Sequence, residues 1–137
     1  MNARVNFDGE IAEFLRVKAS GPQDFTRCPV RDVIDNISGK WSSLLVLILA
    51  TRTHRFGELR RAVPDISQRM LTQTLRNLQR DGLVSRHVFA TLPPSVEYRL
   101  TPLGRSFLQP LMSLVRWSTS NHAAIRSARK DFESAEG

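Results

Sequence analysis

The sequence predicts a mainly α-helical fold with a small β-hairpin wing, a winged helix-turn-helix that dimerises through terminal helices. Three observations predict it. Two amphipathic helical segments are separated only by "VPDI", two strand-like runs follow the second of them, and a long segment with two apolar stripes comes last. Two helices joined by so short a turn are typical of a helix-turn-helix. The 137 residues suit one domain with a modest core.

Two helices are expected between an N-terminal arm of residues 1–25 and the pair of helices that the tight turn joins. Within the arm, a short amphipathic helix follows Asp8. The next helix begins at Pro29 and stops at Gly39, because apolar residues recur there at i, i+3, i+4 and i+7. The segment from about Lys40 to Arg52 is apolar nearly all round, which predicts a core helix.

The tight turn joins two further helices. The first is expected over "RFGELRRAV", where Phe56, Leu59 and Val63 are spaced for one face. The second has Ser67 as its N-cap and Gly82 as its C-terminal stop. Its core face is formed by Leu71, Leu75 and Leu78.

The second helix of this pair has an unusual polar face, because no acidic residue occurs from Ile66 to Arg80. Guanidinium groups, amides and hydroxyls without a carboxylate suit the major groove of double-stranded DNA, where Arg pairs with guanine and Gln with adenine. An ordinary solvated helix face is the alternative. The predicted DNA-binding residues on this helix are Ser67, Gln68, Arg69, Thr72, Gln73, Arg76 and Arg80.

A β-hairpin is expected next, from two strand-like runs at Leu83–Ala90 and Ser95–Leu100 around "TLPP". Apolar residues alternate with Glu97 and Arg99 in the second run, so one face should cover the core. As a wing beside DNA, the hairpin would place Arg86 and Arg99 next to phosphates.

The last long helix is predicted to open at Thr101 and Pro102, to run through about Arg126, and to kink at Pro110. It has two apolar stripes, and a long terminal helix with a wide apolar face suits a dimer partner. The predicted dimer-interface residues are Leu108, Met112 and Val115. The expected division is therefore an arm over 1–25, the winged domain with its dimerisation helix over 26–126, and a flexible tail over 127–137.

The amino-acid composition limits the classes of partner and the cellular compartment that we expect for this protein. Twenty Lys and Arg against thirteen Asp and Glu give a net charge of +7, which favours polyanions such as nucleic acid. The longest apolar run, Leu44–Ala50, is far shorter than the roughly 18 residues that a membrane span needs. A lone cysteine, Cys28, excludes an intrachain disulfide framework. We expect a cytoplasmic protein without a membrane partner.

Enzymatic and metal-binding functions are not predicted. "SGKW" lacks the glycine spacing of a phosphate-binding loop, since Ile34 stands where the first glycine belongs. The three histidines, His54, His87 and His122, have no metal-ligand spacing and no paired nucleophile. The sequence therefore predicts no enzyme, no cofactor and no metal site.

Several segments in order resemble the HxlR-type transcription regulators, relatives of the MarR group. They are Cys28-Pro29-Val30, "GKW" at 39–41, "RFGELRRAVPDISQRMLTQTLRNLQRDGLVSR", and "PPSVEYRLTPLG" from Pro93 to Gly104. The resemblance covers roughly residues 26–118 and leaves the arm outside it. It implies a winged helix-turn-helix homodimer on a palindromic operator and, in several members, a thiol that senses oxidants or electrophiles.

Cys28 is the candidate for such a thiol. With Pro29 as the first helical residue, Cys28 is the N-cap, where the positive helix end and the neighbouring Arg27 and Arg31 favour a reactive thiolate. The alternative is a cysteine that packs as a small apolar residue. The predicted function is a sequence-specific DNA-binding repressor responsive to oxidants or electrophiles. Alternatives are a ligand-responsive regulator without redox sensing, and an RNA-binding or protein-binding winged-helix module.

Overall fold

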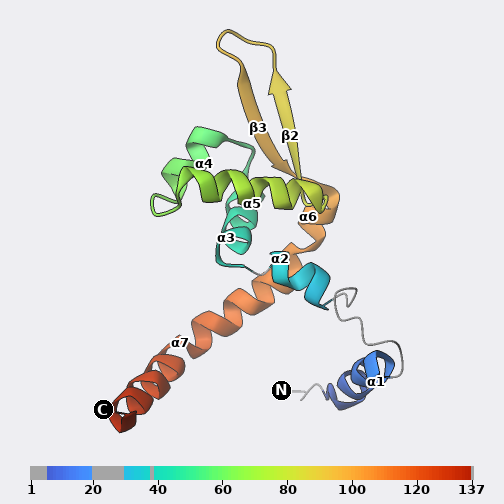
Figure 1. The fold of residues 1–137 in the computed structure, drawn as a ribbon, viewed down its shortest axis with the longest axis vertical. Coiled ribbons are helices and arrows are strands. Elements are labelled where there is room, and N and C mark those ends of the chain that lie inside the picture. Colours follow the sequence, from blue (N-terminus) through green and yellow to red (C-terminus); the bar gives the residue numbers. More distant parts are fainter. Residues whose placement is uncertain (1–5, 20–29, 38, 137) are drawn as a thin grey trace. The chain divides into compact units, whose positions relative to one another are not determined.

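The computed structural model describes residues 6–19, 30–37 and 39–136. The chain divides into two compact units, residues 1–38 and residues 39–137. Figure 1 shows the ribbon coloured along the sequence. Cys28 lies outside the described residues, so the predicted redox site has no structural account here.

The first unit contains two helical segments. Helix α1 spans Asp8–Ala19, as expected, and the side chain of Asn6 accepts a hydrogen bond from the Asp8 backbone N–H at its start (2.9 Å). The second segment differs from the single amphipathic helix that the sequence predicts. It contains a π-helical stretch, η2, over Val30–Ile34, followed by a short α2 over Asp35–Ile37. A wider π-turn rotates the later residues relative to a 3.6-residue period, so the apolar spacing does not form one continuous stripe.

The second unit is built around α3, which spans Lys40–Thr51. The prediction of a core helix is confirmed, because Leu45, Val46 and Leu49 are almost completely buried. Helices α4 and α5, strand β3 and the start of α7 all pack against α3.

The helix-turn-helix follows. Helix α4 spans Phe56–Ala62 and α5 spans Gln68–Arg80, as the apolar spacing predicts. The Ile66 backbone N–H donates to the Val63 carbonyl (3.1 Å) and closes the turn between them. Ser67 caps α5 by accepting from the Met70 backbone N–H (3.0 Å), and the core face of the helix is buried as predicted.

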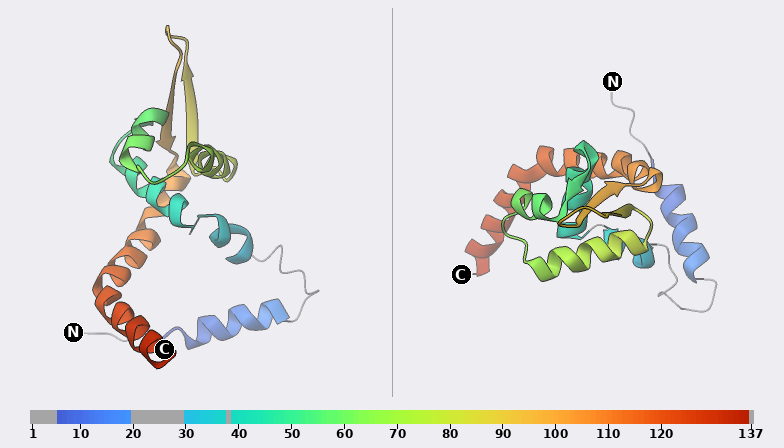
Figure 2. Two further views of the ribbon diagram at one scale, coloured as in Figure 1. Left: turned by 60° about the vertical axis from the view of Figure 1, so that its left-hand side comes forward. Right: turned by 90° about the horizontal axis from the view of Figure 1, so that it is seen from above.

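A three-stranded antiparallel sheet completes the wing, with strand order β1-β3-β2. Strands β2 (Val84–Phe89) and β3 (Ser95–Leu100) form the expected hairpin. The sequence did not predict β1, the two residues His54–Arg55, which pair with Tyr98 and Glu97 of β3. Figure 1 shows the hairpin projecting beyond α4 and α5, and the view from above in Figure 2 places α5 beside it.

The wing is fixed at its base by the start of α6, which spans Pro102–Ser106. Gly82 has a positive φ of 80°, as a helix-terminating glycine requires. Thr101 caps α6 by accepting from the Gly104 backbone N–H (3.1 Å), and its hydroxyl donates to the Gly82 carbonyl. Gly104 lies so close to the Leu83 backbone that an added Cβ would be 2.2 Å from the Leu83 carbonyl oxygen.

The last segment is two helices rather than one kinked helix. Helix α6 ends at Ser106, and α7 spans Leu108–Glu136. The break at Phe107 precedes Pro110, whose ring opposes the carbonyl four residues earlier, that of Ser106, and ends the first helix there. Helix α7 also continues past Arg126, because the following Ala, Arg, Lys and Glu residues favour helix. No helix in the described parts is long and apolar enough to cross a membrane.

Candidate nucleic-acid interface

The exposed face of α5 is the centre of the candidate interface. Gln68, Arg69, Thr72, Gln73, Arg76 and Arg80 are all exposed, and so is the N-cap Ser67. The opposite face is anchored in the core by leucines, so the backbone cannot rotate to withdraw these side chains. The predicted residues therefore share one exposed surface on a fixed helix.

A hollow of about 340 Å³ separates this helix from the wing. Phe56 of α4, Leu75 of α5 and Tyr98 of β3 form its more apolar part, whereas its polar lining comes from two sides. Helix α5 contributes Thr72, Arg76 and Gln79, and strand β2 contributes Arg86. The fold thus brings Arg76 and Arg86, 10 positions apart in the sequence, to one concave surface.

The hollow divides the α5 face into two halves. Thr72 and Arg76 line it, whereas Arg69, Gln73 and Arg80 do not. Successive residues advance about 100° around a helix, which places the latter three further round, away from the wing. Gln73 donates from Nε2 to Asn77 Oδ1 (3.0 Å), which orients its amide along the outer half.

The two wing arginines lie on opposite faces of the sheet. Arg86 pairs with Tyr98, and Arg99 pairs with Ser85. Since paired residues share a face and the side chains of a strand alternate, only Arg86 is on the face that lines the hollow. The Arg99 guanidinium forms an ion pair with Glu97 (Nη2 to Oε2, 3.5 Å). The structure therefore places the two predicted wing residues, Arg86 and Arg99, on different faces of the hairpin.

The N-terminal residues of α5 and its last turn make local contacts. Gln68 accepts from Arg60 Nη1 of α4 (Oε1, 3.3 Å), which links the two helices of the motif. Arg80 Nε approaches Asp81 Oδ1 at 3.5 Å. Asp81 is the first acidic residue after the acid-free stretch, and it partly neutralises that end of the helix.

A second basic hollow, of about 390 Å³, lies beside β1 and carries mixed charge. Arg52, Arg55 and Arg61 line it together with Glu58 and Glu97. The Arg55 backbone N–H donates to Glu58 Oε1 (2.9 Å), and this bond lowers the pKa of Glu58 below its ordinary value, with the charge of Arg52 adding to the effect. The two carboxylates give this hollow a mixed charge, in contrast to the acid-free exposed face of α5.

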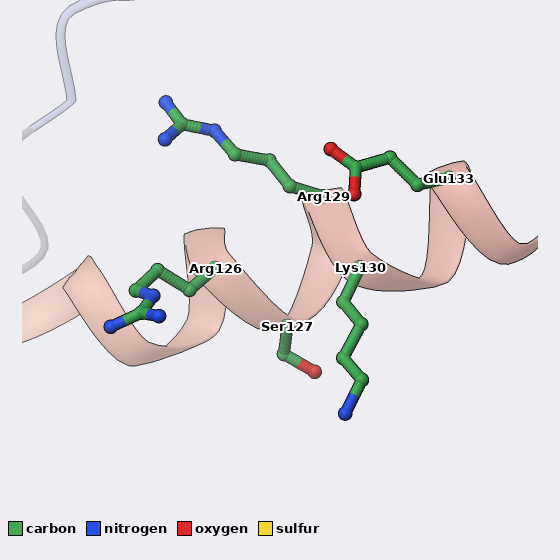
Figure 3. Close-up of a pocket in the computed structure, with 5 residues that line it drawn as sticks. All are labelled: Arg126, Ser127, Arg129, Lys130 and Glu133. Carbon is green, nitrogen blue, oxygen red and sulfur yellow. The ribbon is translucent and has the colours of Figure 1, made fainter.

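A third hollow, of about 610 Å³, runs along the outer part of α7. Figure 3 shows Arg126, Ser127 and Lys130 projecting to one side of the helix and Arg129 and Glu133 to the other. Its lining side chains diverge instead of converging on one point. We do not assign a ligand to it.

The predicted dimer residues lie near the start of α7. Leu108 and Val115 are partly exposed, and Met112 is 37 % exposed. The second apolar stripe of this helix, which includes Leu111 and Leu114, is not uniform, because Leu111 is buried in the core whereas Leu114 is 53 % exposed. The apolar surface available to a partner therefore includes residues of both stripes.

Sequence reasoning missed Gln79 and the apolar side of the hollow. Gln79 lies between Thr72 and Leu75 around the helix, so the helical period could have included it beside Arg76. The contributions of Phe56 and Tyr98 come from other elements and follow only from the tertiary fold. Within the described ranges, no group of three or more His, Cys, Asp or Glu side chains is placed to hold a metal ion.

Residues 36–126 match the model of the HxlR-like helix-turn-helix family. The HTH-type transcriptional regulator YybR of Bacillus subtilis is 41 % identical over 76 % of this chain and 83 % of its own length. The solved structure of the redox regulator HypR in its reduced form superposes with a TM-score of 0.68 at 41 % identity, over 72 % of this chain and 98 % of that one. The structure of diamide-treated YodB of B. subtilis superposes with a TM-score of 0.60 at 28 % identity, over 68 % of this chain and 93 % of that one. The chain therefore belongs to the HxlR-like helix-turn-helix family of transcriptional regulators.

Proposed function

We propose that this transcriptional regulator is a homodimer that binds double-stranded DNA at an inverted-repeat operator, and that it acts as a repressor. The observation that carries the proposal is the acid-free face of α5, which continues across a hollow onto Arg86 of the wing. Such a surface offers guanidinium and amide donors to base edges and to phosphates, with no carboxylate between them.

The two halves of the α5 face suggest a division of roles. We assign contacts with base edges in the major groove to Arg69 and Gln73, on the outer half near the helix N-terminus. Arg76 and Arg86 flank the hollow, and we assign to them the phosphates of the strand that bounds the groove. Arg99 remains a candidate for a separate phosphate contact from the opposite wing face, after it releases Glu97.

The test is the retention of nucleic acid by the full chain. Genomic fragments captured by the protein should share an inverted repeat and should be bound far more tightly than random duplex or single-stranded RNA at the same salt. Equal binding of all duplexes, or a preference for RNA, would favour the alternative of an RNA-binding winged-helix module and contradict the proposal.

Dimerisation is assigned to the apolar surface of α7 around Leu108, Met112 and Val115. The helix is about 43 Å long at 1.5 Å per residue, and its 29 residues exceed what the contact with α3 uses. A variant with Leu108→Glu and Met112→Glu should sediment as a monomer and bind the operator weakly, because both recognition helices are then no longer held together. A native chain that sediments as a monomer at micromolar concentration would exclude this assignment.

We further propose that Cys28 makes the regulator responsive to oxidants or electrophiles. The neighbouring Arg27 and Arg31 favour its thiolate, and redox regulators are among the proteins of similar structure. Diamide would remove two electrons and two protons from the thiols of Cys28 and of Cys28 in a second subunit and join them as a disulfide. A quinone would instead accept the thiolate at a ring carbon and form a thioether.

The redox proposal is tested by operator binding before and after each reagent, for the native protein and for Cys28→Ser. Loss of binding in the native protein alone supports Cys28 as the sensor. An equal response in both proteins, or modification of Cys28 without any effect on binding, contradicts it and favours a regulator that responds to a ligand elsewhere.

A further inference from the structure

The face of the sheet opposite the hollow carries a cluster of polar side chains. Ser85 pairs with Arg99, and His87 pairs with Glu97, so these side chains share one face of the hairpin. Arg55 of β1 pairs with Glu97 from the other side. Glu97 is the only acidic residue in the three strands. One carboxylate therefore lies among two arginines and a histidine.

The contacts within this cluster divide it into two pairs. Glu97 Oε2 lies 3.5 Å from Arg99 Nη2, and Ser85 Oγ shares a hydrogen bond with His87 Nε2 (2.8 Å). A neutral imidazole has one donor and one acceptor, whereas an imidazolium has two donors. The Ser85 hydroxyl suits either form, because it can donate to the ring nitrogen or accept from it. His87 can therefore take up a proton without losing this bond, and the added charge lies across from Glu97.

The other charged and titratable groups near the sheet lie on its opposite face or beyond Glu97. On the opposite face, where α5 packs against β2, the hollow contains Arg76, Arg86 and Tyr98. Beyond Glu97, the mixed-charge hollow beside β1 contains Arg52, His54, Arg55, Glu58 and Arg61. Glu58 accepts from the Arg55 backbone N–H (2.9 Å) and pairs with Arg52 (3.2 Å). Glu97 is thus the carboxylate that faces the imidazole.

We propose that His87 is a pH-sensitive gate on Arg99. Histidine changes its charge between about pH 5 and pH 8. The imidazolium attracts the carboxylate across the strand pair, so Glu97 moves from Arg99 to His87 and the guanidinium is free for a DNA phosphate. Loss of the proton to solvent returns Glu97 to Arg99. The inference rests on the proposed DNA-binding function and adds its regulation, because operator affinity then rises as pH falls.

The test is operator affinity, measured by fluorescence anisotropy at about pH 7.5 and about pH 5.5 with the thiol kept reduced. The native protein should bind about tenfold more tightly at the lower pH, because each subunit of the dimer gains an exposed ion pair. The slope of log affinity against log salt should steepen by about 1.8, since two phosphate contacts are added. His87→Gln should keep the native affinity at the higher pH and show no gain at the lower one.

Two further variants separate the gate from a direct contact of the histidine with DNA. Glu97→Gln leaves Arg99 without its carboxylate, so this variant should bind at the higher pH as tightly as the native protein does at the lower pH. Arg99→Ala should bind at both pH values as weakly as the native protein does at the higher one. His122→Gln, on the exposed part of α7, is the matched control and should keep the native pH response.

The free protein gives a second readout that needs no DNA. The side-chain Nε–H signal of Arg99 in heteronuclear NMR should shift between the two pH values in the native protein, because its ion pair with Glu97 opens. The signal should not shift in His87→Gln. Circular dichroism at both pH values checks that each variant remains folded.

Equal operator affinity of the native protein at the two pH values would overturn the inference. A pH response that persists in His87→Gln or in Arg99→Ala would overturn it as well, and so would an Arg99 signal that shifts alike with and without His87. A native protein that selects no duplex would remove the proposed function and the gate together. A selective native protein without a pH response would remove the gate alone.

Discussion

The arginines that line the hollow between α5 and the wing lead to a quantitative prediction for the salt dependence of DNA affinity. Arg76 and Arg86 line it together, and the proposed function places both at phosphates. Each subunit therefore contributes two such contacts, and a dimer contributes four. Replacing both arginines with alanine removes the contacts and leaves the leucine core of α5 unchanged.

The magnitude follows from counterion release. Each phosphate contact contributes about 0.9 to the slope of log affinity against log salt, so the double variant should lower the slope by about 3.6. Between 50 and 200 mM salt the native protein should lose about a hundredfold more affinity than the variant does. The effect should be similar on cognate and random duplex, because phosphates carry no sequence information.

The assay is fluorescence anisotropy of a labelled operator at several salt concentrations. Arg126→Ala with Arg129→Ala is the matched control, since it removes the same charge from the outer part of α7 (Figure 3). The control should keep the native slope. An unchanged slope in the Arg76 and Arg86 variant, or an equal drop in the control, would refute the assignment of the hollow to DNA phosphates.

Three other predictions concern base contacts and stability. Alanine at Arg69 or Gln73 should cost about 1 to 3 kcal/mol on the operator and much less on random duplex; similar losses on both would exclude base contacts. Gly104→Ala should lower the free energy of unfolding in urea by about 3 kcal/mol, because its Cβ would collide with the Leu83 carbonyl oxygen, whereas Gly57→Ala, with 3.5 Å of room, should not destabilise; equal effects would contradict the packing. The folded-state pKa of Glu58 is lowered, so its carboxylate stabilises the fold above its unfolded pKa and the contribution is lost as pH falls through the folded pKa. The unfolding free energy of Glu58→Gln should accordingly fall less steeply than that of the native protein between about pH 5 and pH 3, and identical acid profiles would contradict the role of this bond.

The recognition helix could be predicted closely from the sequence because its signals are local. Ser67 caps it, Gly82 adopts the positive φ of a stop, and the leucines repeat with the helical period. Each signal depends on residues within one or two turns, so no knowledge of the tertiary fold is needed.

Other features depend on partners that are distant in the sequence. Strand β1 has only two residues, too few to show alternation, and it exists because His54 pairs with Tyr98. The faces of Arg86 and Arg99 follow from the register of the hairpin, which the turn sets. The hollow itself needs α4, α5 and the wing together. The π-turn of η2 has no period that an α-helical pattern could have indicated.

The central claim is that two α5 helices, related by two-fold symmetry, occupy major grooves of an inverted repeat. Base-resolution footprinting of the captured operator by the native protein tests it most directly. We predict two equally protected sites, about 10 or 21 base pairs apart from centre to centre. Protection should be lost on a DNA fragment that contains only half of the repeat. Arg69→Ala should weaken the protection of both sites together. A single asymmetric footprint, or undiminished binding to the half-repeat, would contradict the account.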